Sequence, residues 1–139
     1  MVGIVIATHG AIGTALLETA TDMVGFSVSG IHAISIPADI DRASGWQLLV
    51  DAVNDVERGN GTLILVDMFG GTPSTLALGL LAERDVEVLT GVNLAMVLRA
   101  ILHRQDRTLF ELAPDVLAYG QRNVTSSAHW LTSPNPQPE

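Results

Sequence analysis

His9 is the residue of this chain whose type and position most directly suggest chemistry. It follows the apolar run Val2–Ala7 and precedes an amphipathic stretch that begins at Ala11. A strand that ends here and leads into a helix holds the imidazole at the carboxyl edge of a sheet, where open α/β folds bind their ligands. The basicity of histidine suits nucleophilic attack or proton transfer near neutral pH.

A second polar segment, beginning at Asp67, follows another apolar run in the same way. Asp67 comes directly after Leu63–Val66, and residues 70–73 read Gly-Gly-Thr-Pro. A carboxylate that binds one imidazole nitrogen selects the tautomer and leaves the other nitrogen its lone pair. It also stabilises the positive charge that builds on an attacking ring. Together, His9 and Asp67 predict a histidine nucleophile with an orienting carboxylate.

The glycine-rich turn adds a place for an anion. Gly70 and Gly71 permit backbone angles in which successive N–H groups face inward, and the helix expected after Thr72 adds its N-terminal dipole. Because phosphoryl transfer depends chiefly on positioning and on stabilising the equatorial oxygens, these parts describe a phosphoryl acceptor. We expect the phosphate-binding residues to be Thr8, Gly10, Gly70, Gly71 and Thr72.

Each feature also has a simpler interpretation. A lone histidine after a strand can cap a helix or lie on the surface, Gly-Gly-Thr-Pro can be only a tight turn, and Asp67 can be a structural turn residue. The other histidines have less informative positions: His32 begins a strand at the opposite edge from His9, His103 lies near a helix end, and His129 lies in a weakly patterned segment. No spacing predicts a metal site and no nucleotide-binding loop is present, so we expect no cofactor.

Apolar runs alternate with helix-period segments along the chain. Strands are expected at Val2–Ala7, Ile31–Ile36, Gly61–Val66 and Val86–Thr90. Helices are expected from Ile12 to a stop at Gly25, from about Asp39 to Arg58, after a Thr72 cap with Pro73 at the first helical position, and after an Asn93 cap. This alternation predicts an α/β fold with a parallel sheet and right-handed crossovers.

Strand polarity predicts the order of the sheet. Val2–Ala7 and Leu63–Val66 are continuously apolar, as expected of central strands that are covered on both faces. The other two strands carry polar residues such as His32 and Glu87, which indicates edges. The resulting order, 2-1-3-4, places the carboxyl ends that carry His9 and Asp67 beside each other at the topological switch point.

The C-terminal part is less clearly patterned. Leu109–Tyr119 has helical character, with Pro114 expected either to break the helix early or to lie in its first turn. Val124–Leu131 has the character of a short strand that pairs with an edge of this or another subunit. Residues 133–139 are proline-rich and are expected to be a tail, which leaves residues 1–132 as a single domain.

Composition limits the classes of function. Hydrophobic residues make up 47% of the 139 residues, and no segment suggests a signal peptide or a membrane span, so we expect a cytoplasmic protein. Cysteine is absent, which removes thiolate catalysis and disulfides. The net charge of −8, with no lysine, argues against nucleic acid and suits a basic protein partner, although acidity can also serve solubility alone.

Three separated motifs resemble the IIA component of the mannose-type sugar phosphotransferase system. They are Ile4–Gly10 (IVIATHG), Val66–Pro73 (VDMFGGTP) and Gly91–Leu94 (GVNL), and the likeness covers roughly Met1 to Gln121. The resemblance implies that His9 is phosphorylated and that Asp67 is its hydrogen-bonding partner. It also implies a flavodoxin-like parallel sheet, with an extra antiparallel C-terminal strand that is exchanged in a homodimer.

The same resemblance implies a relay between proteins. The phosphoryl group passes from the histidine-containing phosphocarrier protein to His9, then to a IIB component, and finally to sugar entering through the membrane IIC and IID components. Two positions depart from the common pattern: Thr75 replaces a frequent asparagine and Ala95 a frequent proline. Neither touches the proposed nucleophile, but both bear on the choice of partner and sugar.

Two other functions remain open. The protein can be a regulatory phosphoprotein of the same relay, whose output is binding to another protein rather than sugar uptake. A receiver-like or small-ligand flavodoxin-type module is the third option. A receiver needs an acidic pair at the end of the first strand for its metal, and Thr8-His9-Gly10 supplies none.

Overall fold

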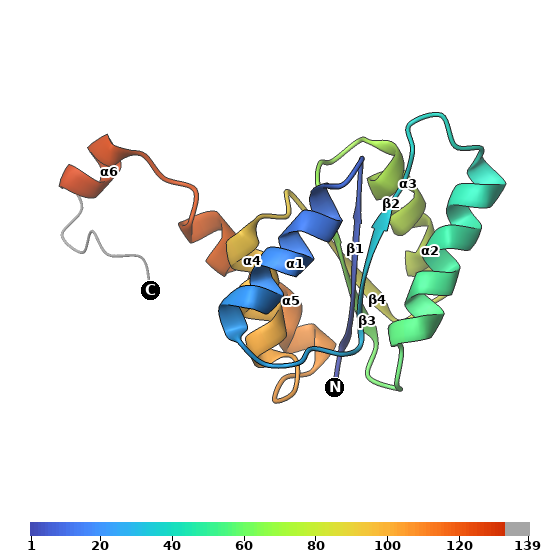
Figure 1. The fold of residues 1–139 in the computed structure, drawn as a ribbon, viewed down its shortest axis with the longest axis horizontal. Helices are drawn as coiled ribbons and strands as arrows, with labels where there is room; N and C mark the ends of the chain where they lie inside the picture. The colour runs from blue at the N-terminus through green and yellow to red at the C-terminus, as the bar shows by residue number, and fades with distance from the viewer. Residues whose placement is uncertain (133–139) are drawn as a thin grey trace.

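A four-stranded parallel sheet organises the molecule. The computed structural model describes residues 1–132, and the strands β1 (Gly3–Thr8), β2 (Ile31–Ser35), β3 (Thr62–Val66) and β4 (Val86–Thr90) lie in the order β2-β1-β3-β4 (Figure 1). The predicted order is confirmed. Ala7 pairs with Val66 and Thr8 with Ser35, so β1 and β3 end side by side.

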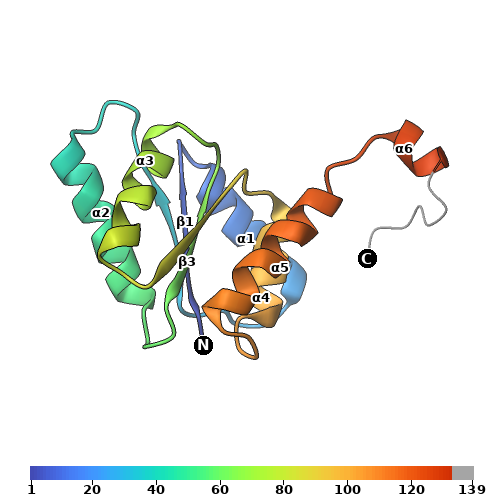
Figure 2. The ribbon, with the colours of Figure 1, turned by 180° about the vertical axis from the view of Figure 1, so that it is seen from behind.

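Helices cover both faces of this sheet. The helices α1 (Ile12–Val24), α4 (Leu94–His103) and α5 (Leu109–Arg122) lie on one face. The helices α2 (Arg42–Val56) and α3 (Thr72–Gly79), with a short 3-10 turn at Leu80–Ala82, lie on the other (Figures 1 and 2). The result is a three-layer α/β architecture.

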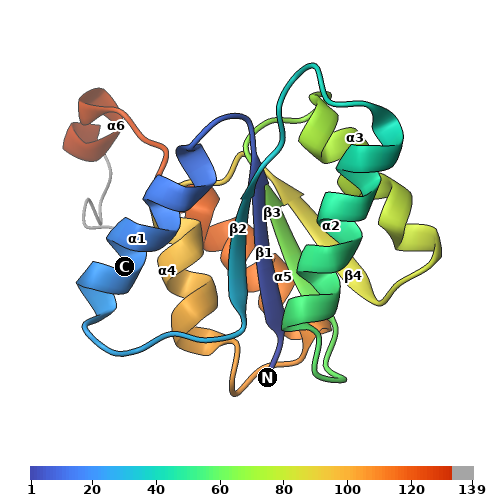
Figure 3. The same cartoon turned by 45° about the vertical axis from the view of Figure 1, so that its right-hand side comes forward.

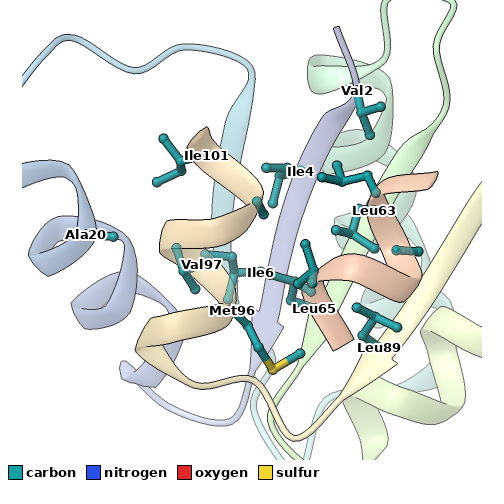
Figure 4. Close-up of a cluster of buried hydrophobic side chains, with 14 residues drawn as sticks. Val2, Ile4, Ile6, Ala20, Leu63, Leu65, Leu89, Met96, Val97 and Ile101 are labelled. Carbon is teal, nitrogen blue, oxygen red and sulfur yellow. The ribbon is translucent and has the colours of Figure 1, made fainter. Parts of the chain in front are cut away.

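The central strands supply both cores because their side chains alternate between the two faces. Ile4 and Ile6 of β1 pack toward α1, α4 and α5, together with Leu63 and Leu65 of β3 (Figure 4). The intervening side chains, including Val5, point toward α2 and α3. All side chains of both strands are buried, as their continuous apolar pattern predicts.

Several helix ends lie where local chemistry places them. Asn93 caps α4 by accepting a hydrogen bond from the Met96 N–H, and Gly25 ends α1 in the left-handed conformation at φ +73°. The predicted Thr72 cap is wrong. Gly71 is the N-cap of α3, Thr72 is its first residue and Pro73 its second.

The C-terminal predictions need two corrections. Pro114 lies inside α5, neither breaking it nor in its first turn, because a Thr108–Glu111 capping box starts the helix and Leu112 and Val116 bury its apolar side. The expected strand at Val124–Leu131 is also wrong. Residues 127–132 form the short helix α6, whose first turn is capped by the Ser126 hydroxyl accepting from the His129 N–H.

β4 is therefore an edge strand in the described part of the chain, and no extra antiparallel strand is present there. The expected proline-rich tail, residues 133–139, lies outside the described residues. Among residues 1–132, no helix has the length and apolar character needed to cross a membrane.

Candidate functional site

His9 and Asp67 meet at the carboxyl edge of the sheet although 58 positions separate them in the chain. The His9 ring nitrogen Nδ1 lies 2.8 Å from Asp67 Oδ2, and the backbone N–H of His9 donates to the same oxygen at 3.0 Å. The sheet brings the two residues together, because β1 and β3 are parallel neighbours and Val66, the last residue of β3, pairs with Ala7, the last but one of β1. Figure 3 shows the loops after both strands leaving the same edge of the sheet, one toward α1 and the other toward α3.

The hydrogen bond determines which imidazole nitrogen is available. A carboxylate only accepts, so Nδ1 carries the proton and Nε2 keeps its lone pair. The other Asp67 oxygen, Oδ1, accepts from the Met68 N–H at 3.1 Å. The His9 side chain is 34% exposed and that of Asp67 only 13%, so the acid lies beneath a ring that remains open to a reactant.

The environment keeps Asp67 ionised. Burial, the largest single influence, raises the pKa of this carboxyl. The hydrogen bonds from the His9 ring and backbone, together with the attraction of the ring whenever it is protonated, outweigh it and hold the pKa of Asp67 below its ordinary value. The carboxylate is thus negative at neutral pH, as is required to stabilise a positively charged imidazole.

Gly71 lies against the open side of the ring. A Cβ atom at this position would lie 2.6 Å from His9 Cε1 and 3.2 Å from Nε2, so any side chain would push the ring away. Gly71 is also the N-cap of α3, whose first-turn N–H groups lack acceptors within the helix. Nε2 therefore faces a helix N-terminus, which is a favourable place for a phosphate.

The turn around the ring is held by hydroxyl groups. Gly70, at φ +86°, donates its N–H to the Ser74 hydroxyl at 2.9 Å, and Ser74 donates to the Gly71 carbonyl oxygen at 2.9 Å. Thr8 is fully buried, and its hydroxyl accepts from the Gly13 N–H at 2.8 Å, which fixes the start of α1.

The predicted phosphate-binding residues thus divide into two groups. Gly71 and Thr72 lie at the start of α3, and Gly10 forms an exposed turn at φ +52°. Thr8 and Gly70 use their polar groups to hold the two turns. Ser74 was not among the predicted site residues, although it is fully buried and holds the turn. The only sign of its role in the sequence is that a serine occurs in the first turn of a helix that follows two glycines.

The remaining histidines lie elsewhere. His32 is on the edge strand β2, with Nδ1 3.5 Å from Asp55 Oδ2, His103 ends α4 and His129 is in α6. Within residues 1–132, no group of three or more potential metal-ligating histidine or acidic side chains is gathered.

Comparisons with known proteins give a consistent result. A family model described as "PTS system fructose IIA component" matches residues 3–117. The PTS system fructose-specific EIIA component of Bacillus subtilis (strain 168) is 29% identical over 128 residues, which cover 88% of this chain and 84% of the relative. The PTS system mannose-specific EIIAB component of Escherichia coli (strain K12) is 28% identical over 115 residues. That match covers 79% of this chain but only 34% of the relative, so the chain spans about a third of that protein.

A solved structure agrees with the sequence matches. The mannose/sorbose specific IIA subunit of the phosphotransferase system from Enterococcus faecalis superposes with a TM-score of 0.76 at 27% identity. The superposition covers 90% of this chain and 93% of the other.

The lowered pKa of Asp67 predicts a pH dependence of stability. Because its pKa is lower in the folded than in the unfolded state, its contribution is complete above the unfolded value of about 3.9 and is lost as the pH falls through the folded value. Urea unfolding of the wild type and of Asp67→Asn, measured from pH 7 downward, should show the wild type losing its advantage below about pH 4. If the free energies of unfolding of the two proteins differ by the same amount down to the lowest pH at which they fold, the pKa of Asp67 is not lowered by folding.

Proposed function

Because this chain belongs to the family of IIA components of mannose-type sugar phosphotransferase systems, we propose that it carries phosphoryl groups on His9. The observation that carries the proposal is the 2.8 Å contact between His9 Nδ1 and Asp67 Oδ2, which leaves Nε2 as the nucleophile. The donor is the histidine-containing phosphocarrier protein and the acceptor is a IIB component. The membrane IIC and IID components then transport the sugar that receives the phosphoryl group.

The transfer step balances without a cofactor. The Nε2 lone pair of neutral His9 attacks phosphorus as the bond between phosphorus and the donor's histidine nitrogen breaks, and the donor ring leaves with that electron pair. His9 becomes a phosphorylated, positively charged ring whose Nδ1 proton remains on the hydrogen bond to Asp67. The carboxylate, 2.8 Å away, stabilises the positive charge as it forms.

The start of α3 forms the proposed cradle for the phosphoryl oxygens. Gly71 is the N-cap of α3 and Thr72 its first residue, and a Cβ atom on Gly71 would lie 3.2 Å from Nε2, so the start of this helix adjoins the nitrogen and its dipole favours the negative charge. Gly10 allows the chain to turn beside the ring. Thr8 and Gly70 contribute by holding these turns through Gly13 and Ser74.

The surface beside the ring suits a protein donor. Met68 and Phe69 directly follow Asp67 and are 56% and 74% exposed, and Ile12 is exposed at the start of α1. A phosphohistidine carried by another protein reaches His9 only if that protein covers these apolar side chains. Burying them on association is favourable, and the net charge of −8 on the chain favours a basic partner.

We also propose a homodimer in which each C-terminal arm, residues 124–132, covers the other copy. A groove of about 830 Å³ runs beside the edge strand β4 and α5 and includes Phe110, which is 90% exposed. The arm extends away from the body (Figures 1 and 2) and presents an exposed Leu131 beside Trp130. Each copy thus has an open groove beside β4 and an exposed arm, and in the proposed dimer the arm of one copy covers the groove of the other.

Phosphorylation assays test the carrier function. With the upstream phosphorelay proteins and labelled phosphoenolpyruvate, the wild type should acquire acid-labile, alkali-stable phosphate, and His9→Ala none. Asp67→Asn should slow single-turnover transfer by about 10²-fold, because an amide does not stabilise a charged imidazole as a carboxylate does.

His32 and Asp55 provide a matched control, since they are another histidine–carboxylate pair, formed between β2 and α2. His32→Ala and Asp55→Asn should leave labelling unchanged. Full labelling of His9→Ala would refute the proposal. Recovery of a regulatory target in place of a IIB component, using phosphorylated protein as bait, would favour the regulatory alternative.

Sedimentation equilibrium tests the dimer. The wild type should have twice the chain mass of 14.7 kDa, and the double variant Trp130→Ser, Leu131→Ser should shift toward the monomer because it removes apolar area from the arm. Met23→Ser, which changes an exposed methionine on α1, is the control. A wild type that stays monomeric at high concentration would exclude this dimer.

A further inference from the structure

A small pocket adjoins the turn that carries Gly71. It has a volume of about 260 Å³ and lies between the start of α2 and the start of α3. Gly70 and Thr72 line it, and these residues flank the glycine that contacts His9 Nε2. The pocket is therefore next to the place where the proposed phosphoryl group would lie. Arg42 is the only cation among the described residues that line it.

Packing holds Arg42 at this pocket. Arg42 is the first residue of α2, and Asp41 caps the helix with both carboxylate oxygens bound by Ser44, at 2.8 Å to its N–H and 2.7 Å to its hydroxyl. Gly45, one turn later, allows α2 to approach α3 closely. A Cβ atom on it would lie 2.8 Å from Leu76 Cδ1. The backbone of Arg42 is thus placed beside the N-terminus of α3, while its side chain is exposed.

The other arginines of the chain have contacts away from this pocket. Arg99 and Arg107 bind Asp115, and Arg104 is buried against the carbonyl oxygens of Ser29 and Gly30. Three more lie on other surfaces: Arg58 donates to the Glu57 carbonyl, Arg84 to Asn54, and Arg122 stacks on Tyr119.

A phosphoryl group on His9 would leave an excess of negative charge at the site, which a cation would balance. A phosphoryl group brings close to two negative charges at neutral pH, next to the carboxylate of Asp67 and near Asp41, which lines the pocket. A helix N-terminus supplies only about half a positive charge. A guanidinium can donate two parallel hydrogen bonds to phosphate oxygens. These bonds would add to the interaction of the phosphate with the helix N-terminus.

We propose that Arg42 binds the phosphoryl oxygens of phosphorylated His9 across this pocket. The proposal rests on the phosphocarrier function proposed above and assigns this site its cation. Arg42 touches the group being transferred, so it stabilises both the phosphorylated protein and the charge of the equatorial oxygens during transfer. Because the side chain is exposed, its effect is smaller than that of a buried arginine and weakens with salt.

A phosphorus NMR titration tests the contact without any partner protein. Phosphoramidate phosphorylates histidine directly, and the resonance of phosphorylated His9 is the one that is absent from His9→Ala. Arg42→Gln should raise the midpoint of its titration by about half a pH unit, since the cation favours the dianion. Arg42→Lys should restore part of the difference. Arg58→Gln, at the far end of α2, is the matched control and should behave as wild type.

Single-turnover transfer from the phosphorylated carrier protein supplies the second measurement. At saturating carrier, Arg42→Gln should be about tenfold slower than Arg58→Gln, with the difference shrinking at high salt. Equal titration midpoints for these two variants would overturn the proposal. So would slower transfer with an unchanged titration, because Arg42 would then act only on the partner. A carrier that fails to phosphorylate the wild type would refute the relay, while the titration would still decide the contact.

Discussion

The hydrogen bond between His9 and Asp67 depends on one topological fact, the parallel adjacency of β1 and β3. Parallel neighbours end at the same edge, and the pairing of Ala7 with Val66 brings Asp67, one residue beyond Val66, within reach of His9, two residues beyond Ala7. The bond then sets the tautomer of the ring, while the ring keeps the acid ionised despite partial burial. Each partner thus gives the other the protonation state that phosphoryl transfer requires.

The turns around this pair are built so that nothing obstructs Nε2. Gly71 leaves room that any Cβ atom would fill, and Ser74 holds the preceding glycine through its hydroxyl. Thr8 does the same for the start of α1 by accepting from Gly13. The buried hydroxyls therefore serve the geometry of the loops, whereas the N-terminus of α3 adjoins Nε2 through Gly71.

Much of this arrangement could be predicted from the sequence because it follows from burial. The continuous apolar runs that precede His9 and Asp67 mark central strands, and the polar residues in the outer strands mark edges, which together give the sheet order. Asn93 and Gly25 could be recognised as helix ends because each acts on its own helix. The Asn93 side chain accepts from a backbone N–H of the first turn, and Gly25, which has no side chain, adopts the left-handed conformation.

Other details depended on contacts that the sequence pattern does not encode. The bond from Gly70 to Ser74 depends on the actual path of the turn, and so does the start of α3, where Gly71 rather than Thr72 is the N-cap. Pro114 is tolerated inside α5 because tertiary burial and the capping box outweigh one missing hydrogen bond. The segment Val124–Leu131 was expected to be a strand, but it has no neighbouring strand in the described chain, and residues 127–132 adopt a helix.

The most direct test of the proposed mechanism is to determine which ring nitrogen of His9 is phosphorylated. NMR of the ¹⁵N-labelled, phosphorylated protein, recorded through the ¹⁵N–³¹P coupling, identifies it in one experiment. The geometry predicts phosphorus on Nε2 of His9, with the Nδ1 proton still present and shared with Asp67. Phosphorus on Nδ1 would contradict the account, because that nitrogen is the one the carboxylate binds.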